Sequence, residues 1–559
     1  MSKWTRTLMA AVALAALFAP MTRVAAQKAE PPKAEEKPAE AASDKVEIDF
    51  NFEGLIFVQA KVNGKGPYEF LFDSGATQSV VNARLAKELA LEEHDSPGAV
   101  QGVGTAEAKL VVLDSVELGA FKREEVLAAS MDLDHMSGTL GRHMMGIVGQ
   151  NIIRMMQKIE LDFSTCTLGM TRYAAGEEPS NMQEEMMVRM LKGGGGIPGL
   201  PGGRQPRQPK EEPGEQPKPG KEKEDEFSAP VAPMGEWLFQ AAPDKTTESA
   251  AARHPKEGMT LTYTTGELSV MGRKMELIPY WYLDVVVNGK NKRFMFDTGA
   301  SMLLVLDDGL ASELAVPESF TYPVKGIGKG DTKSGLLESF QVGVVQETDV
   351  ACSIMDLPDM TSQLGMLGRL PGTEKLKFDG IVGITLATRF KKMTVNTKDR
   401  NIEFTAYGAD EKAAQDPFAG EDFVKDCVIR TWNGKAGKFG LSGDSVQLEE
   451  WKKHGLETGG MMVEEVEANG AAAKAGIRKG DIITHLLDVK DLPEMEDAKS
   501  ANGEVEVRDF PALIMFACSQ NPGSVVSVRV KRGTETLVVP VTLADYGFKG
   551  AFPEKHKAK

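Results

Sequence analysis

The sequence predicts a mainly β protein made of two similar halves and a smaller C-terminal unit. Segment 70–76 (Phe-Leu-Phe-Asp-Ser-Gly-Ala) recurs as segment 294–300 (Phe-Met-Phe-Asp-Thr-Gly-Ala). Runs of strand-forming residues are short and are separated by turn residues, on both sides of a long stretch rich in Gly, Pro, Lys and Glu. The repeated segment therefore predicts a duplicated β domain whose halves are related by pseudo-twofold symmetry.

Each half is expected to contain the same local elements in the same order. The pair Asn63-Gly64, repeated as Asn288-Gly289, predicts a tight hairpin just before each Asp-(Ser/Thr)-Gly turn. A short helix is predicted after each turn, at 83–91 and 310–315. Strands are predicted at 46–62, 68–72, 110–118, 158–163, 280–287, 292–296 and 393–396.

The repeat extends far beyond the turn. Asp297 follows Asp73 by 224 residues, and the same offset relates Gly102-Val103-Gly104 to Gly326-Ile327-Gly328. Further along, Ile147-Val148-Gly149 recurs as Ile381-Val382-Gly383. Two aspartates that a pseudo-twofold axis brings face to face can share one proton and activate a water molecule.

Together these motifs resemble the retropepsin-like aspartic proteases, whose pattern is an Asp-(Thr/Ser)-Gly-Ala turn, a flap hairpin with glycine, and a later apolar-apolar-Gly segment. The resemblance covers about 130 residues of each half. It implies that each half is a closed β-barrel and that the two halves form one bilobal unit. The first half departs from the pattern at Met145-Gly146, where the second half keeps Asp379-Gly380.

The resemblance also implies roles for individual residues. Asp73 and Asp297 would be the catalytic pair. The residues expected to support the catalytic turns are Ser74, Gly75, Thr298 and Gly299, and those expected in the flaps are Gly102, Val103, Gly104, Gly326, Ile327 and Gly328. No cofactor and no metal ion is expected.

The function that follows is an aspartic-type endopeptidase that hydrolyses polypeptide substrates with an activated water molecule. Two alternatives stay open: a catalytically silent duplicate that serves as a peptide-binding scaffold, and an envelope assembly factor. Both turns keep the aspartate, the hydroxyl residue and the glycine, which favours the enzyme because a scaffold needs none of them.

The N-terminal residues predict export. Lys3 and Arg6 precede an apolar run at 8–18, and Val24-Ala25-Ala26 matches a signal-peptide cleavage site. We therefore expect removal of residues 1–26 by cleavage after Ala26, a secreted or periplasmic protein, and no transmembrane anchor in the mature chain. Residues 27–45 are expected to be a disordered tail.

The composition argues against several other classes. The net charge of −16 disfavours binding to nucleic acid. Four scattered cysteines are too few for a disulfide framework, so we expect them to be mostly unpaired and buried. His135 and His143 lie near methionines, but the repeat replaces His135 with Asp359, which disfavours a metal site.

The composition also sets the expected domain boundaries. The halves should occupy 46–175 and 259–410, separated by a disordered linker at 176–258 in which 182–192 forms only a transient helix. Such a linker is long enough for the two halves to pair within one molecule. A connector at 411–435 should lead to the third unit at 436–545.

The third unit resembles the PDZ domains that are appended to bacterial secreted proteases. The match rests on the run 475–483, which reads Ala-Gly-Ile-Arg-Lys-Gly-Asp-Ile-Ile. A strand at 459–466, a helix at 509–520 capped by Asp509, and a hairpin of 525–532 with 535–543 surround it. The resemblance implies an α+β, partly open barrel.

PDZ domains bind peptide C-termini beside a strand. The resemblance implies that Phe439, Gly440 and Leu441 receive the carboxylate, with Gly459-Gly460 as an alternative. We expect a groove beside the strand 461–466, lined by Leu513 and Phe516 of the helix. A unit used only for packing or oligomerisation is the other interpretation.

Overall fold

The computed structural model describes residues 45–193, 253–357, 373–487 and 504–557, apart from short gaps at 53, 96–99, 103, 107, 180, 271–272, 326–328, 410, 412 and 414–415. The predicted signal peptide, nearly all of the predicted tail, and residues 194–252 of the predicted linker lie outside the described residues.

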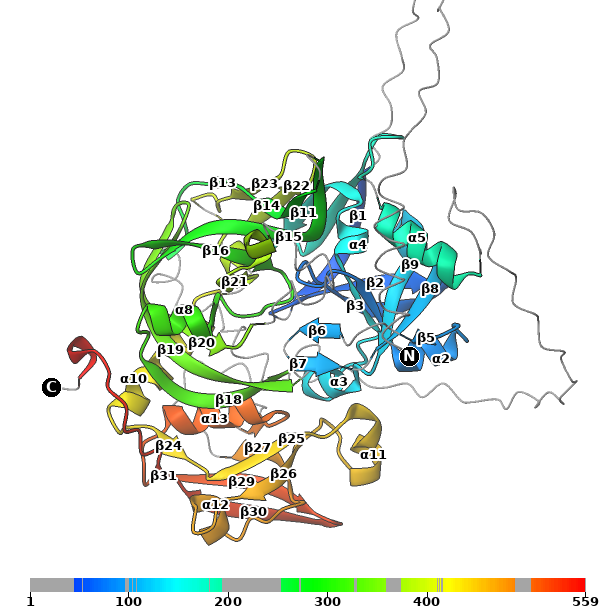
Figure 1. The fold of residues 1–559 in the computed structure, drawn as a ribbon. Helices are drawn as coiled ribbons and strands as arrows, with labels where there is room; N and C mark the ends of the chain where they lie inside the picture. The colour runs from blue at the N-terminus through cyan, green and yellow to red at the C-terminus, as the bar shows by residue number, and fades with distance from the viewer. Residues whose placement is uncertain are drawn as a thin grey trace, which may run out of the picture.

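The first half is a closed β-barrel with short helices at its edges (Figure 1). Its elements are β1 (Lys45–Phe52), β2 (Ile56–Val62), β3 (Lys65–Phe72), β4 (Ser79–Asn82), α2 (Ala83–Glu88), β5 (His94–Asp95), β6 (Val100–Gly102), β7 (Gly104–Ala106), β8 (Lys109–Leu118), β9 (Phe121–Met131), α3 (Asp134–Leu140), β10 (Gly146–Val148), α4 (Gln150–Ile153), β11 (Met156–Asp162) and β12 (Thr167–Arg172). The barrel runs β2-β3-β10-β4-β9-β8, and pairing of Val62 with Val116 joins β8 back to β2.

The second half repeats this circuit. Its elements are β13 (Met259–Thr262), β14 (Thr264–Val270), β15 (Arg273–Val287), β16 (Lys290–Asp297), β17 (Leu304–Asp307), α8 (Asp308–Glu313), β18 (Glu318–Lys325), β19 (Lys329–Val342), β20 (Val345–Met355), η3 (Thr373–Leu376), β21 (Gly380–Gly383), α9 (Thr385–Thr388), β22 (Lys392–Asn396) and β23 (Asn401–Thr405). The order is β15-β16-β21-β17-β20-β19, and pairing of Val287 with Phe340 joins β19 to β15. The prediction of a mainly β fold with two barrel halves is confirmed.

The predicted Asn-Gly hairpins set the register that leads into each catalytic turn. Asn63 and Gly64 have φ values of 51° and 74°, and Asn288 and Gly289 have 47° and 74°. Positive φ at both central residues is the requirement of a type I′ turn, which Asn-Gly meets at low cost. The hairpins therefore deliver β3 and β16 to equivalent positions in the two barrels.

The two halves are joined by main-chain hydrogen bonds. Strand β11 of the first half pairs antiparallel with β22 of the second half, with Ile159 opposite Val395. This pairing makes one continuous sheet in the order β13-β23-β22-β11-β12-β1. The halves consequently share a sheet as well as a seam of side chains.

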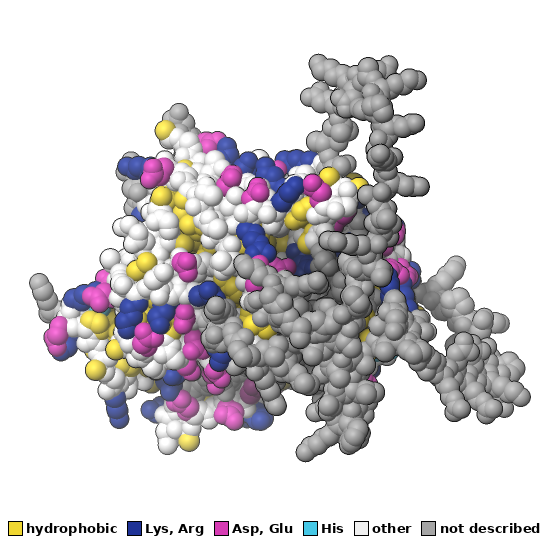
Figure 2. All heavy atoms as spheres, turned by 45° about the horizontal axis from the view of Figure 1, so that its top comes forward, with side chains coloured by type: hydrophobic (Ala, Val, Ile, Leu, Met, Phe, Trp, Pro, Cys, Tyr) yellow, Lys and Arg dark blue, Asp and Glu magenta, His cyan; other side chains and the backbone are white. Residues whose placement is uncertain are grey.

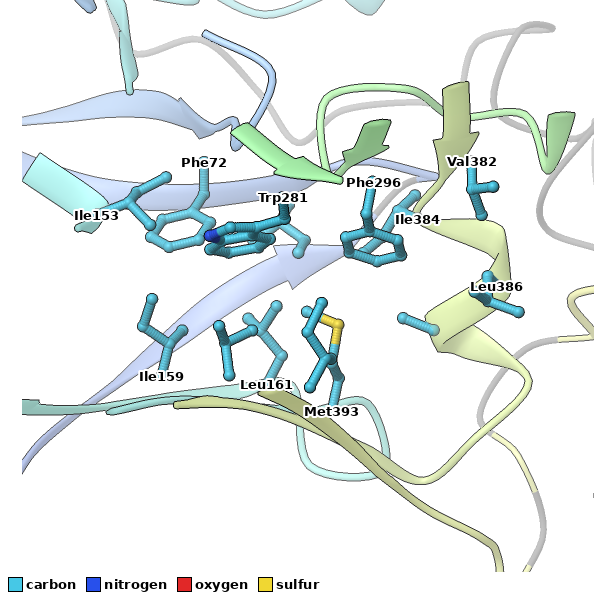
Figure 3. Packing of buried hydrophobic residues seen from close by; sticks show 14 of the residues in the cluster. Phe72, Ile153, Ile159, Leu161, Trp281, Phe296, Val382, Ile384, Leu386 and Met393 are labelled. Carbon is cyan, nitrogen blue, oxygen red and sulfur yellow. The ribbon is translucent and has the colours of Figure 1, made fainter. Parts of the chain in front are cut away.

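Apolar side chains from both halves form one core beside this shared sheet. Figure 3 shows Phe72, Trp281 and Phe296 in a row, with Ile159 and Met393 facing them. Trp281 stacks on Phe296 with a centroid distance of 6.3 Å. Fully burying one such side chain stabilises the fold by about 1.5–3 kcal/mol, so the core resists separation of the halves.

The third unit is built on an antiparallel sheet, with α13 packed near β24 and β25 and α12 near β30. Its elements are α10 (Ala419–Trp432), β24 (Gly437–Lys438), β25 (Leu441–Ser445), η4 (Leu448–Glu450), α11 (Trp451–His454), β26 (Met461–Val466), α12 (Ala471–Lys474), β27 (Ile482–Leu487), β28 (Val505–Glu506), α13 (Phe510–Ser519), β29 (Val525–Arg532), β30 (Glu535–Thr542), β31 (Ala544–Asp545) and η6 (Glu554–His556). The sheet order is β25-β26-β27-β29-β30, with β28 beside β27. As predicted, Asp509 caps α13, because its carboxylate accepts a hydrogen bond of 2.7 Å from the Ala512 amide.

The third unit packs on both halves (Figure 1). Helices α10 and α13 contact β18 of the second half, where Trp432 Nε1 donates a hydrogen bond of 2.9 Å to the Glu318 carbonyl oxygen. Strand β25 contacts α3 of the first half, where the hydroxyls of Thr139 and Ser445 lie 2.9 Å apart. The unit therefore bridges the two barrels.

The predicted linker is wrong at its start. Residues Met182–Leu191 form helix α5, which packs against β9. Glu184 is buried and accepts hydrogen bonds from the Leu127 amide at 3.0 Å and from Asn151 Nδ2 at 3.1 Å. Because these partners are distant in sequence, composition alone could not reveal that this helix docks onto the first half.

The predicted connector is also wrong. Residues 411–435 contain α10, which buries Phe423, Val424 and Val428 in the core of the third unit. The unit also extends past its predicted end at 545, because Phe552 stacks on Trp432 with a centroid distance of 5.4 Å. These segments mix charged and apolar residues, so their composition did not predict that their apolar side chains become buried when they pack against the rest of the third unit.

All four cysteines are free, and three of them, Cys352, Cys427 and Cys518, are buried, as expected. Among the residues that the structure describes, no helix is both long and apolar enough to cross a membrane. On the face in Figure 2, basic side chains alternate with acidic ones over the described surface.

Candidate active site

Strand pairing fixes the position of the two Asp-(Ser/Thr)-Gly turns. Strand β10 runs parallel to β3 with Val148 beside Phe72, and β21 runs parallel to β16 with Val382 beside Phe296. The Asp73 amide donates a hydrogen bond of 3.0 Å to the Val148 carbonyl oxygen. The departure at Met145-Gly146 leaves this register unchanged, so both aspartates emerge at equivalent strand ends.

The turns bring Asp73 and Asp297 together, as predicted from the repeat. The Gly75 amide donates to Asp73 Oδ1 at 2.7 Å and to Asp297 Oδ1 at 3.0 Å. The Gly299 amide donates to Asp297 Oδ1 at 2.8 Å, and the two carboxyl groups hydrogen bond to each other. Both aspartates are half-buried, so one side of the pair stays open to a reactant.

Glycine is required at both turns because the opposite carboxyl group lies where a side chain would begin. A Cβ atom on Gly75 would lie 2.4 Å from Asp297 Oδ2. A Cβ atom on Gly299 would lie 2.5 Å from Asp73 Cγ. Each glycine thus makes room for the aspartate of the other half.

The electrostatics favour one shared proton. Burial raises the pKa of Asp73 well above the usual aspartate value, and the charge of Asp297 adds to the shift. Burial also raises the pKa of Asp297, although hydrogen bonds from Asp73 and from the Gly299 and Gly75 amides oppose the rise. Two carboxylates this close cannot both ionise at low cost, so the pair holds a proton over a range of pH.

Ser74 and Thr298 tie the two turns together across the seam. The Ser74 amide donates to Thr298 Oγ1 at 2.9 Å, and the Thr298 amide donates to Ser74 Oγ at 3.0 Å. Thr298 Oγ1 in turn donates to the Phe72 carbonyl oxygen at 2.9 Å, and Ser74 Oγ to that of Phe296 at 3.2 Å. Both side chains are fully buried, so every link of this reciprocal network is protected from water.

Two residues that contact the turns, Gln150 and Tyr280, were not predicted from the sequence. Gln150 is buried and its Nε2 donates to the Ser74 carbonyl oxygen at 2.9 Å. Tyr280 is buried beside both aspartates and hydrogen bonds to Thr77 of the first half, and burial raises its pKa well above the usual tyrosine value. The hairpin register could have revealed Tyr280, because Trp281 pairs with Phe296 and Tyr280 and Asp297 are the next residues along the two strands.

The predicted flaps are hairpins in both halves. Strands β6 and β7 pair around Gly102 and Gly104, whereas Val103 lies outside the described residues. Strands β18 and β19 pair up to Lys325 and Lys329, and the turn of Gly326, Ile327 and Gly328 lies outside the described residues. Strand β7 lies beside β19, so the two hairpins meet near the seam.

The structure brings most of the residues predicted to bind peptide in the third unit into one pocket. A cavity of ≈ 210 Å³ is lined by Phe439, Gly440, Leu441 and Leu513 together with Ile514 and Ala517. Phe516 does not line it, because the side chain packs in the core at 2% exposure.

The pocket lies beside β25 and α13. A cavity of ≈ 420 Å³ does lie beside β26, where Met462, Val463, Glu464 and Glu465 line it, but neither Leu513 nor Phe516 belongs to its lining. Leu513 lines the pocket beside β25, which is the edge strand of the sheet. Gly459 and Gly460, the alternative carboxylate loop, pack against Trp451 and Ile482 instead of lining the pocket.

Among the described residues, no three His, Cys, Asp or Glu side chains gather in a way that could hold a metal ion. The chemistry available at the seam is that of two carboxyl groups and one shared proton.

Comparison with known proteins adds two kinds of finding. A search of curated proteins gave no match to this chain. Among solved structures, a retropepsin-like aspartic protease from Rickettsia conorii is 16% identical, with 25% of this chain and all of that chain covered at a TM-score of 0.20. Soybean basic 7S globulin is 8% identical, and the match covers 67% of this chain and 99% of that chain at a TM-score of 0.28. The HtrA-type protease AlgW with a decapeptide is 14% identical, and the match covers 54% of this chain and 99% of that chain at a TM-score of 0.19. All three TM-scores are below 0.5, so none of these likenesses supports a conclusion.

The aspartyl protease family model matches residues 58–152 and 283–383. Each match contains one Asp-(Ser/Thr)-Gly turn and the strands that hold it. The double match and the paired barrels support a tandem aspartic-protease-like fold and a protease-like function.

Proposed function

We propose that this protein is an aspartic-type endopeptidase that hydrolyses peptide bonds with a water molecule activated by Asp73 and Asp297. One observation carries the proposal: the Gly75 amide hydrogen bonds to both carboxyl groups, which places two acids of raised pKa side by side. General acid–base catalysis near the operating pH needs this arrangement, whereas a passive scaffold gains nothing from two half-buried carboxyl groups in contact.

The reaction follows from the shared proton. The ionised carboxylate accepts a proton from water as the water oxygen attacks the scissile carbonyl carbon, while the protonated carboxyl donates to the carbonyl oxygen. Collapse of the tetrahedral intermediate breaks the C–N bond and returns a proton to the leaving nitrogen. The roles belong to the pair, because coupled carboxyls titrate jointly. The Ser74–Thr298 network keeps the carboxyls in register throughout.

The two hairpins, which meet at β7 and β19, favour an extended polypeptide as substrate, because hairpin strands offer main-chain groups with which a peptide strand can pair. We further propose that the third unit is a PDZ-like domain that binds peptide C-termini in the pocket between β25 and α13. The edge position of β25 supports this proposal, because an edge strand can pair with an added peptide strand. The signal-like N-terminal residues support export.

The test uses the variants Asp73→Asn and Asp297→Asn, with Asp284→Asn on the exposed face of β15 as matched control. A denatured protein substrate is digested from acidic to neutral pH with and without pepstatin. Each dyad variant should lose activity by about 10²-fold to 10⁴-fold, the usual worth of general acid–base catalysis, while the control keeps wild-type turnover.

The pH dependence is a second readout. Hydrolysis should follow a bell-shaped curve, because the pair must hold one proton and is inactive when it holds two or none. Folded wild-type protein that cleaves no substrate at any pH, yet binds peptides, would support the silent scaffold instead. Unchanged turnover in both dyad variants would show that the chemistry lies elsewhere.

A further inference from the structure

The pocket of the third unit has a wall that belongs to the second protease half. Thr321 of β18 lines the cavity together with Phe510, Ile514 and Ala517 of α13. Tyr546, which follows β31, also lines it and hydrogen bonds to the backbone of Thr321. A molecule that fills this pocket must therefore touch β18 as well as the third unit.

The residues of β18 on both sides of Thr321 pack against or hydrogen bond to the third unit. Phe320 and Tyr322 are buried in a hydrophobic cluster that includes residues of α10 and α13. Ser319 Oγ donates a hydrogen bond of 3.4 Å to the Val428 carbonyl oxygen of α10. Because protein interiors are close-packed, a displacement of β18 cannot be absorbed locally and is passed to its neighbours.

The neighbour on the other side is the segment that follows the turn of Asp297. The Tyr322 hydroxyl lies 2.8 Å from Ser353 Oγ and 3.5 Å from Met302 Sδ, and Ser353 Oγ lies 2.7 Å from the same sulfur. Met302 is five residues after Asp297 in the sequence. The contacts from Thr321 through Tyr322 to Met302 thus connect the pocket with the segment that directly follows the turn of Asp297.

We propose that a peptide with a free C-terminal carboxylate and an apolar last side chain binds in this composite pocket and activates the dyad through β18. The inference rests on the proposed function of both the dyad and the third unit. Phe510, Leu513, Ile514 and Ala517 offer an apolar wall, which suits the last side chain. Lys438 and Glu467 both line the pocket and form an ion pair at 2.5 Å, so the peptide carboxylate would bind the Lys438 ammonium group by displacing Glu467 from it.

The direction of the effect follows from packing. Thr321 is exposed and lines the pocket, so an apolar side chain bound there would pack against it. Occupancy then holds Tyr322 against Ser353 and Met302, which restrains the turn that carries Asp297. By linkage, whatever stabilises the active arrangement of the turn also raises the affinity of the pocket for peptide.

Two peptides that differ only at the C-terminus test the inference on the full chain. The first ends in Ala-Val with a free carboxylate, and the second ends in Ala-Val amide. Binding is measured by fluorescence anisotropy, and turnover is measured with a quenched substrate too short to reach the pocket. The acid should bind and raise kcat at least five-fold, the lower end of typical coupling, whereas the amide should do neither.

Hydrogen exchange of segments 297–303 and 318–324 gives a readout that needs no catalysis. The acid peptide should slow exchange in both segments of the Asp297→Asn variant, even if that variant is inert. Thr321→Ala should still bind the peptide but should lose the change at 297–303, and Tyr322→Phe should do the same. Thr536→Ala on the exposed face of β30 is the matched control and should respond like wild type.

The outcomes separate this inference from the function on which it rests. Slowed hydrogen exchange without any hydrolysis would refute the proposed endopeptidase function but support the coupling between the pocket and the segment 297–303. If the protein hydrolyses substrate and binds the peptide, but the peptide changes neither hydrogen exchange nor turnover, the coupling is refuted and the endopeptidase function stands. Absence of peptide binding in folded protein would overturn the pocket assignment and the coupling together.

Discussion

Gly75→Ala is the change for which the structure predicts the sharpest effect. The added methyl group would lie 2.4 Å from Asp297 Oδ2, 2.5 Å from its Cγ and 2.6 Å from its Oδ1. Ordinary contact requires about 3.4 Å or more, so the carboxyl group must move by about 1 Å. A misplacement of about 1 Å of a reacting group costs on the order of 10²-fold in rate. We therefore expect kcat to fall by about 10²-fold while KM for a peptide substrate changes little.

The control for this variant is Gly64→Ala in the first Asn-Gly hairpin. Gly64 has φ of 74° and no heavy atom within 4 Å of an added Cβ, so alanine there costs backbone strain of about 1 kcal/mol without touching the dyad. Steady-state kinetics and thermal unfolding of both variants decide the matter. If Gly75→Ala kept near wild-type kcat, or lost activity only as much as Gly64→Ala, the close approach of the two turns would be wrong.

The remaining predictions concern stability. Thr298→Ala leaves the buried Ser74 amide and Phe72 carbonyl without their partner, which should lower the free energy of unfolding by about 1–3 kcal/mol. Thr298→Ser should restore most of this free energy. A loss below about 0.5 kcal/mol in chemical denaturation would contradict the network. Burial of Glu506 outweighs the neighbouring Arg508 charge and raises its pKa to about 7 from 4.5. The folded state therefore holds this proton more tightly than the unfolded state, and stability should fall as pH rises between those values, by on the order of 3 kcal/mol. Glu506→Gln should reduce the slope; Glu421, whose pKa is also raised to about 7, and the pair Asp73 and Asp297, whose pKa values are raised by burial, supply what remains. An unchanged slope in the variant would refute the assignment.

The catalytic turns could be predicted because the signal is local and repeated. An apolar strand, an aspartate, a hydroxyl residue and a glycine lie side by side in the chain, and the constant offset shows that the second copy has the same role. The Asn-Gly hairpins fix the register of the strands leading to Asp73 and Asp297 by backbone conformation alone. Even Tyr280 was within reach of such an argument, since counting back from the second hairpin places it opposite Asp297.

The docked helices could not be predicted in the same way. Helices α5 and α10 lie in segments whose composition is charged or mixed, and each is held by partners far away in the chain, such as Leu127 and Asn151 for Glu184. The identity of the edge strand was equally hidden, because β25 and β26 differ only in what pairs with their second edge. These features depend on burial against other units, which a local pattern does not encode.

The sequence by itself determined the duplicated β architecture and the two aspartates with their hydroxyl and glycine neighbours, because hairpin geometry and repeat spacing act over a few residues. Only the tertiary structure decided that Thr321 of the second half walls the pocket of the third unit, and that Tyr322 reaches Met302 on the other side. Such contacts arise from the way close-packed surfaces fit when whole units meet, and their free energy is distributed over residues hundreds of positions apart.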